Sequence, residues 1–132
     1  MTMDAAWDFD EPAQELARQD PDLLEDVTAV LAALRAHPRV MWAERMNVGA
    51  FAVERTDRQG QVRRRYVRCG FKGLSDIIGQ MRDGRFLAVE VKRRKGGVVS
   101  PEQREFLART AECGGVAFIA RSAVDVKRNF GE

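Results

Sequence analysis

The fold is decided by residues 75–92, whose sequence reads SDIIGQMRDGRFLAVEVK. Two largely apolar segments, residues 75–81 and 85–92, flank a short polar connection that reads RDG. Each segment has the length and side-chain composition of a β-strand, and a glycine in a short connection is typical of a hairpin turn. The stretch therefore predicts two antiparallel strands joined by a tight loop.

The length of that loop decides which side chains face one another. A two-residue turn at Asp83 and Gly84 would place Asp76 opposite Val91, on the other face from Glu90. A three-residue loop, with glycine in the left-handed conformation at its third position, places Asp76 directly opposite Glu90. Because Gly84 occupies that third position, we favour the longer loop and expect two facing carboxylates about one strand spacing apart.

Within residues 85–92 one face of the strand is apolar and the other carries Glu90 and Lys92. Charged groups at such positions are costly to bury unless they are paired or coordinate a cation. Magnesium bound by Asp76 and Glu90 would supply a Lewis acid and an acidic water for phosphodiester hydrolysis, with Lys92 orienting the nucleophile or neutralising charge. The alternative for a Glu-x-Lys motif alone is an exposed ion pair, worth ~0–1 kcal/mol.

Further elements are expected on both sides of this hairpin. Asp20 before Pro21 predicts the N-cap of a helix that ends near residue 37. Its apolar stripe would consist of Leu24, Val27, Leu31 and Leu34. Strands are expected at residues 40–47 and 62–69, and residues 50–55 would continue the first strand or pair with it.

The C-terminal part predicts helix, strand and helix. Ser100, Pro101 and Gln103 form a capping box that begins a helix ending near residue 113. Residues 116–120 form a short buried strand, and Ser122 is expected to cap a last helix that reaches residue 128. The resulting order, αβββαβα with a hairpin inside it, predicts an α/β fold with a mixed β-sheet flanked by helices.

Composition limits the class of protein. A length of 132 residues with 45% hydrophobic and 32% charged residues suits one ordered domain. No apolar stretch approaches the ~18 residues that cross a bilayer, and the N-terminus is unlike a secretory signal. Cys69 and Cys113 lack metal-type spacing, and His37 is the only histidine, so we expect neither a zinc site nor a Ser/His/Asp triad.

Charge is distributed unevenly along the chain. Residues 1–26 carry a net charge of −8 and residues 27–132 carry +10. We expect residues 1–19 to be an acidic, flexible arm and residues 20–132 to be one basic domain that binds the phosphate backbone of DNA. The densest basic runs are Arg63, Arg64 and Arg65, and Lys92, Arg93, Arg94 and Lys95. A solvated basic face without a polyanionic partner is the alternative.

An ordered series of motifs resembles the VRR-NUC family, part of the PD-(D/E)XK nuclease superfamily and related to Holliday junction resolvases. The match spans residues 40 to about 126, and its motifs include CGFKGLSDIIG (69–79), GRFLAVEVK (84–92), GVVSPEQREF (97–106) and GGVA (114–117). Without an apolar span or a secretory signal the protein is expected to be cytoplasmic. The likeness is closest to small stand-alone members from phages and bacteria, which implies a bacterial cell or a phage-infected host. Ser75 stands where many superfamily members have proline.

The resemblance implies roles for individual residues. Asp76 and Glu90 would bind Mg²⁺ or Mn²⁺, with the Val91 carbonyl completing the coordination sphere, and Lys92 would be the catalytic lysine. Gln103 matches a catalytic glutamine of the family, a role that can coexist with its place in the capping box. Residues expected to contact DNA, besides the basic runs, are Arg45, Asn47 and Lys72. A structural ion pair is the alternative for Arg45.

The resemblance implies a metal-dependent endodeoxyribonuclease that acts as a homodimer. Its preferred substrate would be branched DNA, such as a Holliday junction or flap. The alternative is a non-catalytic module that binds nucleic acid and keeps the fold. Glu25, the nearest first-helix acid, lies opposite the apolar stripe and is left outside the site. Trp42, Phe71, Phe106 and Phe118 are expected in the core rather than as base-stacking residues, and Phe71, beside Lys72, is the one that we would test for stacking.

Overall fold

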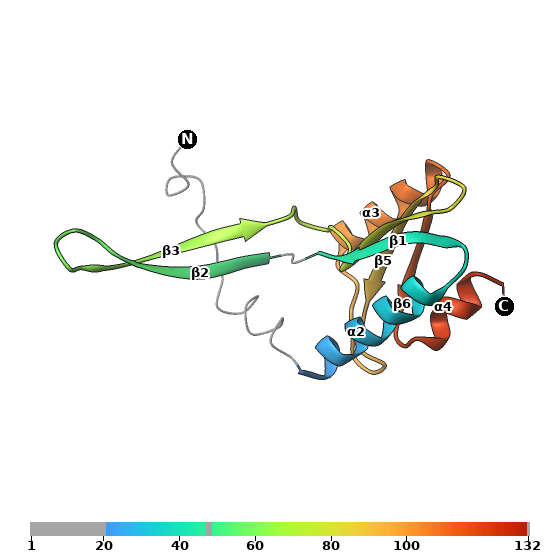
Figure 1. Cartoon of the computed structure of the whole chain (residues 1–132), viewed down its shortest axis with the longest axis horizontal. Helices are drawn as coiled ribbons and strands as arrows, with labels where there is room; N and C mark the ends of the chain where they lie inside the picture. Colours follow the sequence, from blue (N-terminus) through green and yellow to red (C-terminus); the bar gives the residue numbers. More distant parts are fainter. Residues whose placement is uncertain (1–20, 47–48, 132) are drawn as a thin grey trace.

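A computed structural model describes residues 21–46 and 49–131. Two separate sheets are formed, one of four strands and one of two (Figure 1). The elements in chain order are α2 (Pro21–Ala36), β1 (Val40–Arg45), β2 (Gly49–Thr56), β3 (Val62–Cys69), β4 (Ile77–Met81), β5 (Phe86–Val91), α3 (Pro101–Glu112), β6 (Val116–Ala120) and α4 (Val124–Asn129). The predicted mixed α/β class is confirmed, and five strands lie between the first two of these helices.

The four-stranded sheet has the order β1-β4-β5-β6. β4 is antiparallel to both β1 and β5, whereas β6 is parallel to β5. The parallel pair is connected through α3, as a parallel crossover requires. β5 is therefore a central strand, and all of its residues except the first, Phe86, are buried.

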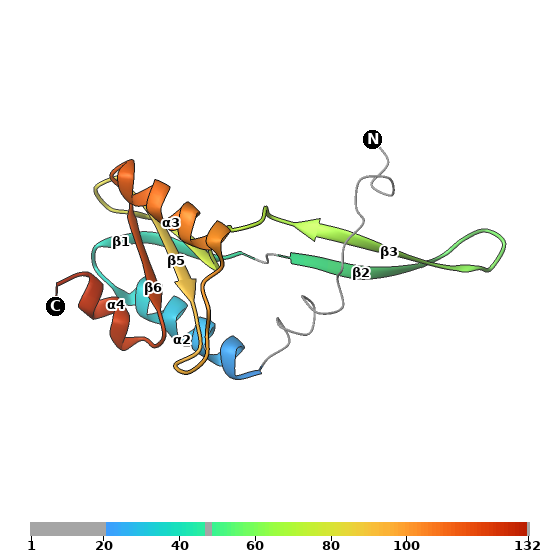
Figure 2. The same ribbon diagram turned by 180° about the vertical axis from the view of Figure 1, so that it is seen from behind.

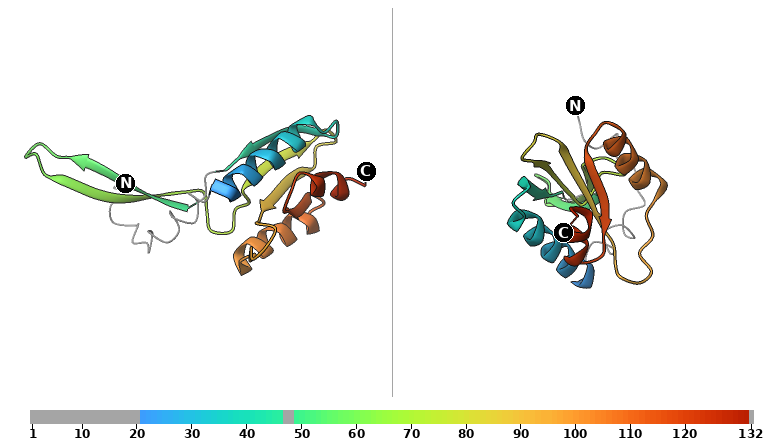
Figure 3. Two further views of the ribbon diagram at one scale, coloured as in Figure 1. Left: turned by 90° about the horizontal axis from the view of Figure 1, so that it is seen from below. Right: turned by 90° about the vertical axis from the view of Figure 1, so that its right-hand side faces the viewer.

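Helices cover both faces of this sheet. α2 and α4 contact one another on one face, and α3 lies against β5 and β6 on the other (Figure 3). The core beneath α2 and α4 includes Leu87 and Val89 of β5, Leu34 of α2 and Val126 of α4. The opposite face of β5 carries Glu90 toward α3.

The predicted hairpin register is confirmed. Ile77 pairs with Val89 and Gly79 with Leu87, which is the register of the three-residue loop. Gly84 has φ of +95°, the left-handed conformation that this loop requires and that glycine adopts without strain. Glycine is also required at position 79, because a Cβ there would lie 2.3 Å from the Trp42 carbonyl oxygen of β1.

The apolar stripe of α2 differs from the prediction. Val27 and Leu34 are buried as expected, but Leu24 is 40% exposed, while Val30 is fully buried. Leu31 is only partly buried. Val27, Val30 and Leu34 share one helix face, and the position of Val30 moves the centre of that face away from Leu24.

The start of the last helix also differs from the prediction. Ala123 is the N-cap of α4 and makes no side-chain capping bond, so the expected cap by Ser122 is wrong. The Asp125 carboxylate instead accepts a hydrogen bond from the backbone N–H of Arg121 at 2.7 Å. Ser122 contributes only its carbonyl oxygen, which accepts from the Asp125 N–H at 3.1 Å.

Two predictions about the N-terminal residues lie outside the described part of the chain. One is the acidic arm at residues 1–19, and the other is the capping role of Asp20. The helix that Asp20 would cap is present and ends at Ala36, next to the predicted boundary. His37, which follows it, is buried beside Phe130, and its Nδ1 accepts from the Arg39 N–H at 3.1 Å.

Candidate active site

Asp76 and Glu90 meet at the open end of the β4/β5 hairpin. Met81 donates its N–H to the carbonyl oxygen of Arg85, so this pair is hydrogen-bonded. Because hydrogen-bonded and non-hydrogen-bonded pairs alternate, Asp76 and Glu90 fall at a non-hydrogen-bonded position, where side chains lie closest. The Asp76 carboxylate is also bound directly to β5, since its Oδ2 accepts from the Val91 N–H at 2.8 Å.

Glu90 is a buried carboxylate with only part of its hydrogen-bonding capacity used. The residue is 1% exposed, and its Oε1 accepts a hydrogen bond from Gln103 Nε2 at 2.9 Å. Its Oε2 is buried and has no hydrogen-bond partner among the described residues. Burial, and next the negative charge of Asp76, raise the pKa of Glu90 to about 9. The site therefore disfavours a second negative charge unless a cation compensates for it.

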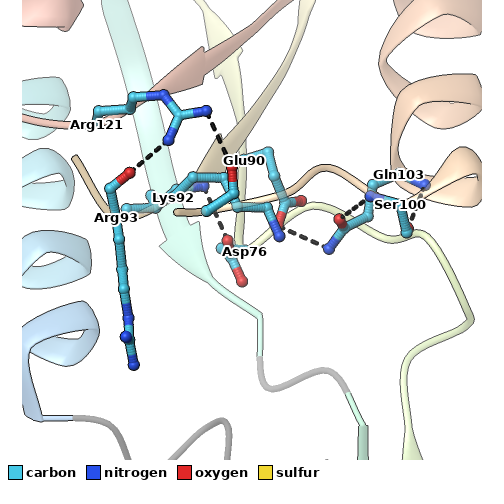
Figure 4. A network of polar contacts seen from close by, with 9 residues as sticks. Asp76, Glu90, Lys92, Arg93, Ser100, Gln103 and Arg121 are labelled. Atoms are coloured by element: carbon cyan, nitrogen blue, oxygen red, sulfur yellow. Dashed lines mark hydrogen bonds and ion pairs between the residues drawn. The ribbon is translucent and has the colours of Figure 1, made fainter. Parts of the chain in front are cut away.

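Gln103 contacts the candidate site and also belongs to the capping box of α3. Its Nε2 donates to Glu90, while its Oε1 accepts from the backbone N–H of Ser100 at 2.9 Å. Ser100 Oγ in turn accepts from the Gln103 N–H at 3.1 Å, which completes the capping box of α3. The cap thus orients the glutamine amide toward the carboxylate (Figure 4).

Lys92 follows the last residue of β5 and lies on the same face as Glu90. Its Nζ is 3.6 Å from Glu90 Oε1, and its side chain is 17% exposed. The Lys92 N–H donates to the Ala120 carbonyl oxygen at 3.0 Å, which fixes the backbone beside β6. The ammonium group is close to the Glu90 carboxylate and still partly accessible to a substrate.

These residues fit a hard divalent cation. Two carboxylates face one another, and one buried oxygen of Glu90 is without a hydrogen-bond partner in the described chain. Oxygen donors of this kind suit Mg²⁺ or Mn²⁺. The described part of the chain contains no group of three His, Cys, Asp or Glu residues that could hold a metal ion. A backbone oxygen and water would therefore have to complete the coordination sphere, and the Val91 carbonyl is the one that the sequence suggested.

Arg121 takes part in the site environment and was not found from the sequence. Its Nη1 donates to the Arg93 carbonyl oxygen, and its Nη2 donates to the Gly97 carbonyl oxygen at 3.2 Å (Figure 4). The guanidinium thus connects both ends of the loop that follows Lys92. Gly97 packs closely there, because a Cβ would lie 2.9 Å from the Cβ of Lys92. The only sequence signal for this contact was the position of Arg121 directly after the predicted buried strand at residues 116–120.

Other predicted residues lie around the site rather than in it. Arg45 ends β1 and is exposed, and no ion pair of its side chain occurs within residues 21–46 and 49–131. Lys72 is paired with Glu102 of α3 at 3.3 Å, although its side chain remains 70% exposed. Asn47 lies outside the described residues, and Glu25 is exposed on α2, as expected.

The aromatic residues divide between core and surface. Phe118 is buried as expected. Trp42 is 41% exposed, so its expected place in the core is wrong, and its Nε1 donates to Gln80. Phe71 is 51% exposed and packs one side on the half-buried Phe106, with ring centroids 5.4 Å apart. Phe71 therefore still offers accessible aromatic surface close to Lys72.

The two basic runs occupy different parts of the molecule. Arg93, Arg94 and Lys95 lie exposed in the loop that Arg121 connects. Arg63, Arg64 and Arg65 lie in β3, where successive side chains point to opposite faces. Arg64 therefore faces away from Arg63 and Arg65, and the three do not form one continuous face.

Comparison with known families agrees with this geometry. The VRR-NUC domain family matches residues 24–124, which is most of the chain, and the protein belongs to this family. Membership makes it a nuclease of the PD-(D/E)XK type, for which DNA is the substrate. A search of the curated proteins finds no match. Among the described residues, no helix is long and apolar enough to cross a membrane.

Proposed function

We propose that the protein is a Mg²⁺- or Mn²⁺-dependent endodeoxyribonuclease that cleaves branched DNA and acts as a homodimer. The observation that carries the proposal is the facing Asp76–Glu90 pair beside Lys92, in which Glu90 is buried and one of its carboxylate oxygens has no hydrogen bond within the described residues. A binding module without catalysis would gain nothing from burying Glu90 next to a second carboxylate, because that burial destabilises the fold.

In this mechanism Asp76 and Glu90 would hold the cation, with the Val91 carbonyl as a further oxygen donor. The bound cation supplies a Lewis acid for the phosphoryl oxygen and lowers the pKa of water. Gln103 keeps Glu90 oriented through its hydrogen bond to Oε1. Lys92 donates from Nζ to the attacking water or to a non-bridging phosphate oxygen, where negative charge develops. The Arg93, Arg94 and Lys95 loop contacts neighbouring phosphates.

The preference for branched DNA is supported by the distribution of basic residues and by the family. The basic loop after β5 and the arginines of β3 lie in separate parts of the molecule. Two separate basic surfaces can contact two differently directed DNA segments, as a junction or flap presents. Arg45, Asn47 and Lys72 are proposed as further DNA-binding residues.

The test is cleavage of a labelled panel of four-way junctions, flaps, forks, duplex and single strands in Mg²⁺, Mn²⁺, Ca²⁺ or EDTA. We expect cuts in branched substrates with Mg²⁺ or Mn²⁺, and none with EDTA. The Glu90→Gln variant should be inactive, whereas the matched Glu105→Gln change on exposed α3 should retain activity. Sedimentation analysis of the free protein tests the homodimer.

Two results would contradict the proposal. Full cleavage in EDTA would exclude the metal-dependent chemistry, and unchanged cleavage by purified Glu90→Gln would exclude the site. Junction binding without cleavage under any metal condition would favour the non-catalytic alternative. A metal readout that does not need activity is the melting temperature, because Mg²⁺ binding to the folded state should raise it for the parent and not for Glu90→Gln.

A further inference from the structure

The ribbon formed by β2 and β3 stands apart from the rest of the molecule. The two eight-residue strands pair with one another over their whole length, from Gly49 with Cys69 to Thr56 with Val62. No residue of either strand belongs to the described hydrophobic core, and no other described element packs extensively against them. The ribbon projects from the body in views from opposite sides (Figures 1 and 2).

The root of the ribbon lies at the candidate catalytic carboxylate. On the β1 side, the Met46 N–H donates to the backbone carbonyl oxygen of Asp76 at 2.7 Å. On the β3 side, the chain returns to Asp76 through a short segment that packs on α3, where a Cβ at Gly73 would lie 2.6 Å from the Glu102 carbonyl oxygen. Whatever the ribbon binds is therefore connected directly to the cleavage site.

The ribbon is strongly basic. Residues 49–69 contain six arginines and two acids, a net charge of +4. One of the acids, Asp57, belongs to the structure of the turn: it accepts from the N–H groups of Gln59 and Gln61 and from Arg63 Nε. Its pKa is held below the ordinary value, first by the Gln61 N–H and next by Arg63. The Asp57 carboxylate is therefore ionised and is paired with Arg63 within the ribbon.

The arginines are distributed over both faces of the ribbon. Register places Arg55, Arg63 and Arg65 on one face, and Arg64 with Tyr66 on the other. Arg64 lies over the Tyr66 ring, with 5.7 Å from its Cζ to the ring centroid. Arg55, Arg58 and Arg64 are all exposed. A ribbon with cations on both faces suits a partner that surrounds it with negative charge, as the two phosphate backbones of a DNA groove do.

Two physical arguments identify the occupant. A lone two-stranded hairpin is only marginally stable in water, so a ribbon of this length gains from a partner. A second ribbon of the same charge would be repelled, and the arginines also oppose edge pairing with another copy. A duplex backbone complements the charge and gains entropy from released counterions.

We propose that the β2–β3 ribbon is an arm that binds duplex DNA beside the cleavage point. This inference rests on the proposed nuclease function for the position of the cleaved bond. It adds that the ribbon makes DNA binding depend on the length of the duplex. Eight residues per strand reach about 27 Å, which corresponds to about eight base pairs. The enzyme should therefore bind best where a duplex continues for about that length next to the branch.

The test uses two variants and one matched control. In the first, an Asn-Gly turn replaces residues 53–65, which shortens the ribbon and removes no described core residue. The second, Arg55→Gln/Arg58→Gln/Arg64→Gln, keeps the ribbon and the Asp57–Arg63 pair. The control, Arg104→Gln/Arg109→Gln/Arg128→Gln, removes equal charge from α3 and α4. Circular dichroism and melting curves verify that each variant folds.

Binding is measured by fluorescence anisotropy with plain duplexes of about 8, 12, 16 and 24 base pairs, in the Glu90→Gln background, over a range of salt. From the shortest to the longest duplex, the affinity of the parent protein should rise at least about tenfold. The affinity of the protein with the shortened ribbon should rise less than about threefold over the same series. The triple variant should lower the salt slope by about two to three units, and the control should not lower it to that extent.

Three results would contradict the proposal that the ribbon is a DNA-binding arm. One is the same length dependence in parent and both variants, and another is an equal effect of the control. The third is a loss of dimer on shortening the ribbon with no change in DNA binding, which would assign the ribbon to a second copy. Cleavage is not measured here, so a protein that binds as expected but cuts no DNA would contradict only the proposed function.

Discussion

The carboxylate of Asp76 accepts a hydrogen bond from the backbone N–H of Val91 at 2.8 Å. This bond lies one residue beyond the β4/β5 ladder and connects the loop before β4 to the last residue of β5. Asp76 therefore has a structural function that is separable from its charge. The separation can be tested because asparagine retains an acceptor oxygen while it removes the negative charge.

We expect Asp76→Asn to lose at least about 100-fold in cleavage rate and to stay within ~1 kcal/mol of the parent in unfolding free energy. Asp76→Ala should lose cleavage as well and also about 1–3 kcal/mol, because the N–H of the buried Val91 is left without an acceptor. Cleavage assays and urea unfolding in EDTA measure the two effects. Equal stability of the two variants would show that the bond to Val91 contributes nothing.

Glu90 should destabilise the metal-free protein above pH 4.5. Burial raises its pKa from 4.5 to about 9. Below pH 4.5 both the folded and the unfolded chain hold the proton, so the group has no effect. Between pH 4.5 and 9 the unfolded chain releases the proton and the folded chain retains it, so folding stability falls as pH rises. Above pH 9 the penalty is constant.

Glu90→Gln should therefore stabilise the protein in EDTA by roughly 1–3 kcal/mol at pH 7. The gain should shrink toward zero as the pH falls to 4.5. Urea unfolding of parent and variant at several pH values measures it, and Glu105→Gln on the exposed surface of α3 is the matched control. A destabilised Glu90→Gln at pH 7 would show that the carboxylate is stabilised without a cation.

Local chemistry explains which parts of this fold could be predicted from sequence. Gly84 dictated the loop length and hence the Asp76–Glu90 register, and Ser100 with Gln103 dictated the start of α3. Both signals lie within a few residues of the feature they determine. The burial of Glu90 was not evident, since it depends on α3 covering a face that alternation alone marks as polar.

Features that depend on distant contacts escaped the sequence. The sequence predicts that residues 50–55 continue the first strand or pair with it, which is wrong, because β2 pairs with β3 and nothing local showed that this pair leaves the main sheet. The Arg121 contact joins residues 28 positions apart. Leu24 is exposed because the buried face of α2 consists of Val27, Val30 and Leu34, and the helical period alone does not determine which apolar residues meet the sheet.

Gln103 and Ser100 allow capping and catalysis to be separated. Both side chains belong to the same capping box, but only Gln103 donates to Glu90. Ser100→Ala and Gln103→Ala should each cost about 0.5–2 kcal/mol in unfolding free energy. Only Gln103→Ala should also lower the cleavage rate, by about tenfold or more, because Glu90 loses its orienting donor. Equal rates for the two variants would assign Gln103 to the cap alone.

Arg121 connects the carbonyl oxygens of Arg93 and Gly97 and so closes the loop that follows Lys92. Arg121→Lys keeps the charge but loses the planar fork that reaches two acceptors at once. We expect amide hydrogen exchange in residues 92–99 to accelerate, with β4 and β5 still protected. Cleavage should fall about 3- to 30-fold, because the position of Lys92 is no longer held.

The matched control for this change is Arg109→Lys on α3, where the guanidinium pairs with Glu105 on the surface. That pair is exposed, so the substitution should leave both exchange and cleavage near parent values. Faster exchange in residues 92–99 with an unchanged cleavage rate would show that the loop need not be fixed for Lys92 to act. Because the fork contacts only backbone oxygens, a loss of cleavage in Arg121→Lys would reflect loop geometry rather than side-chain charge.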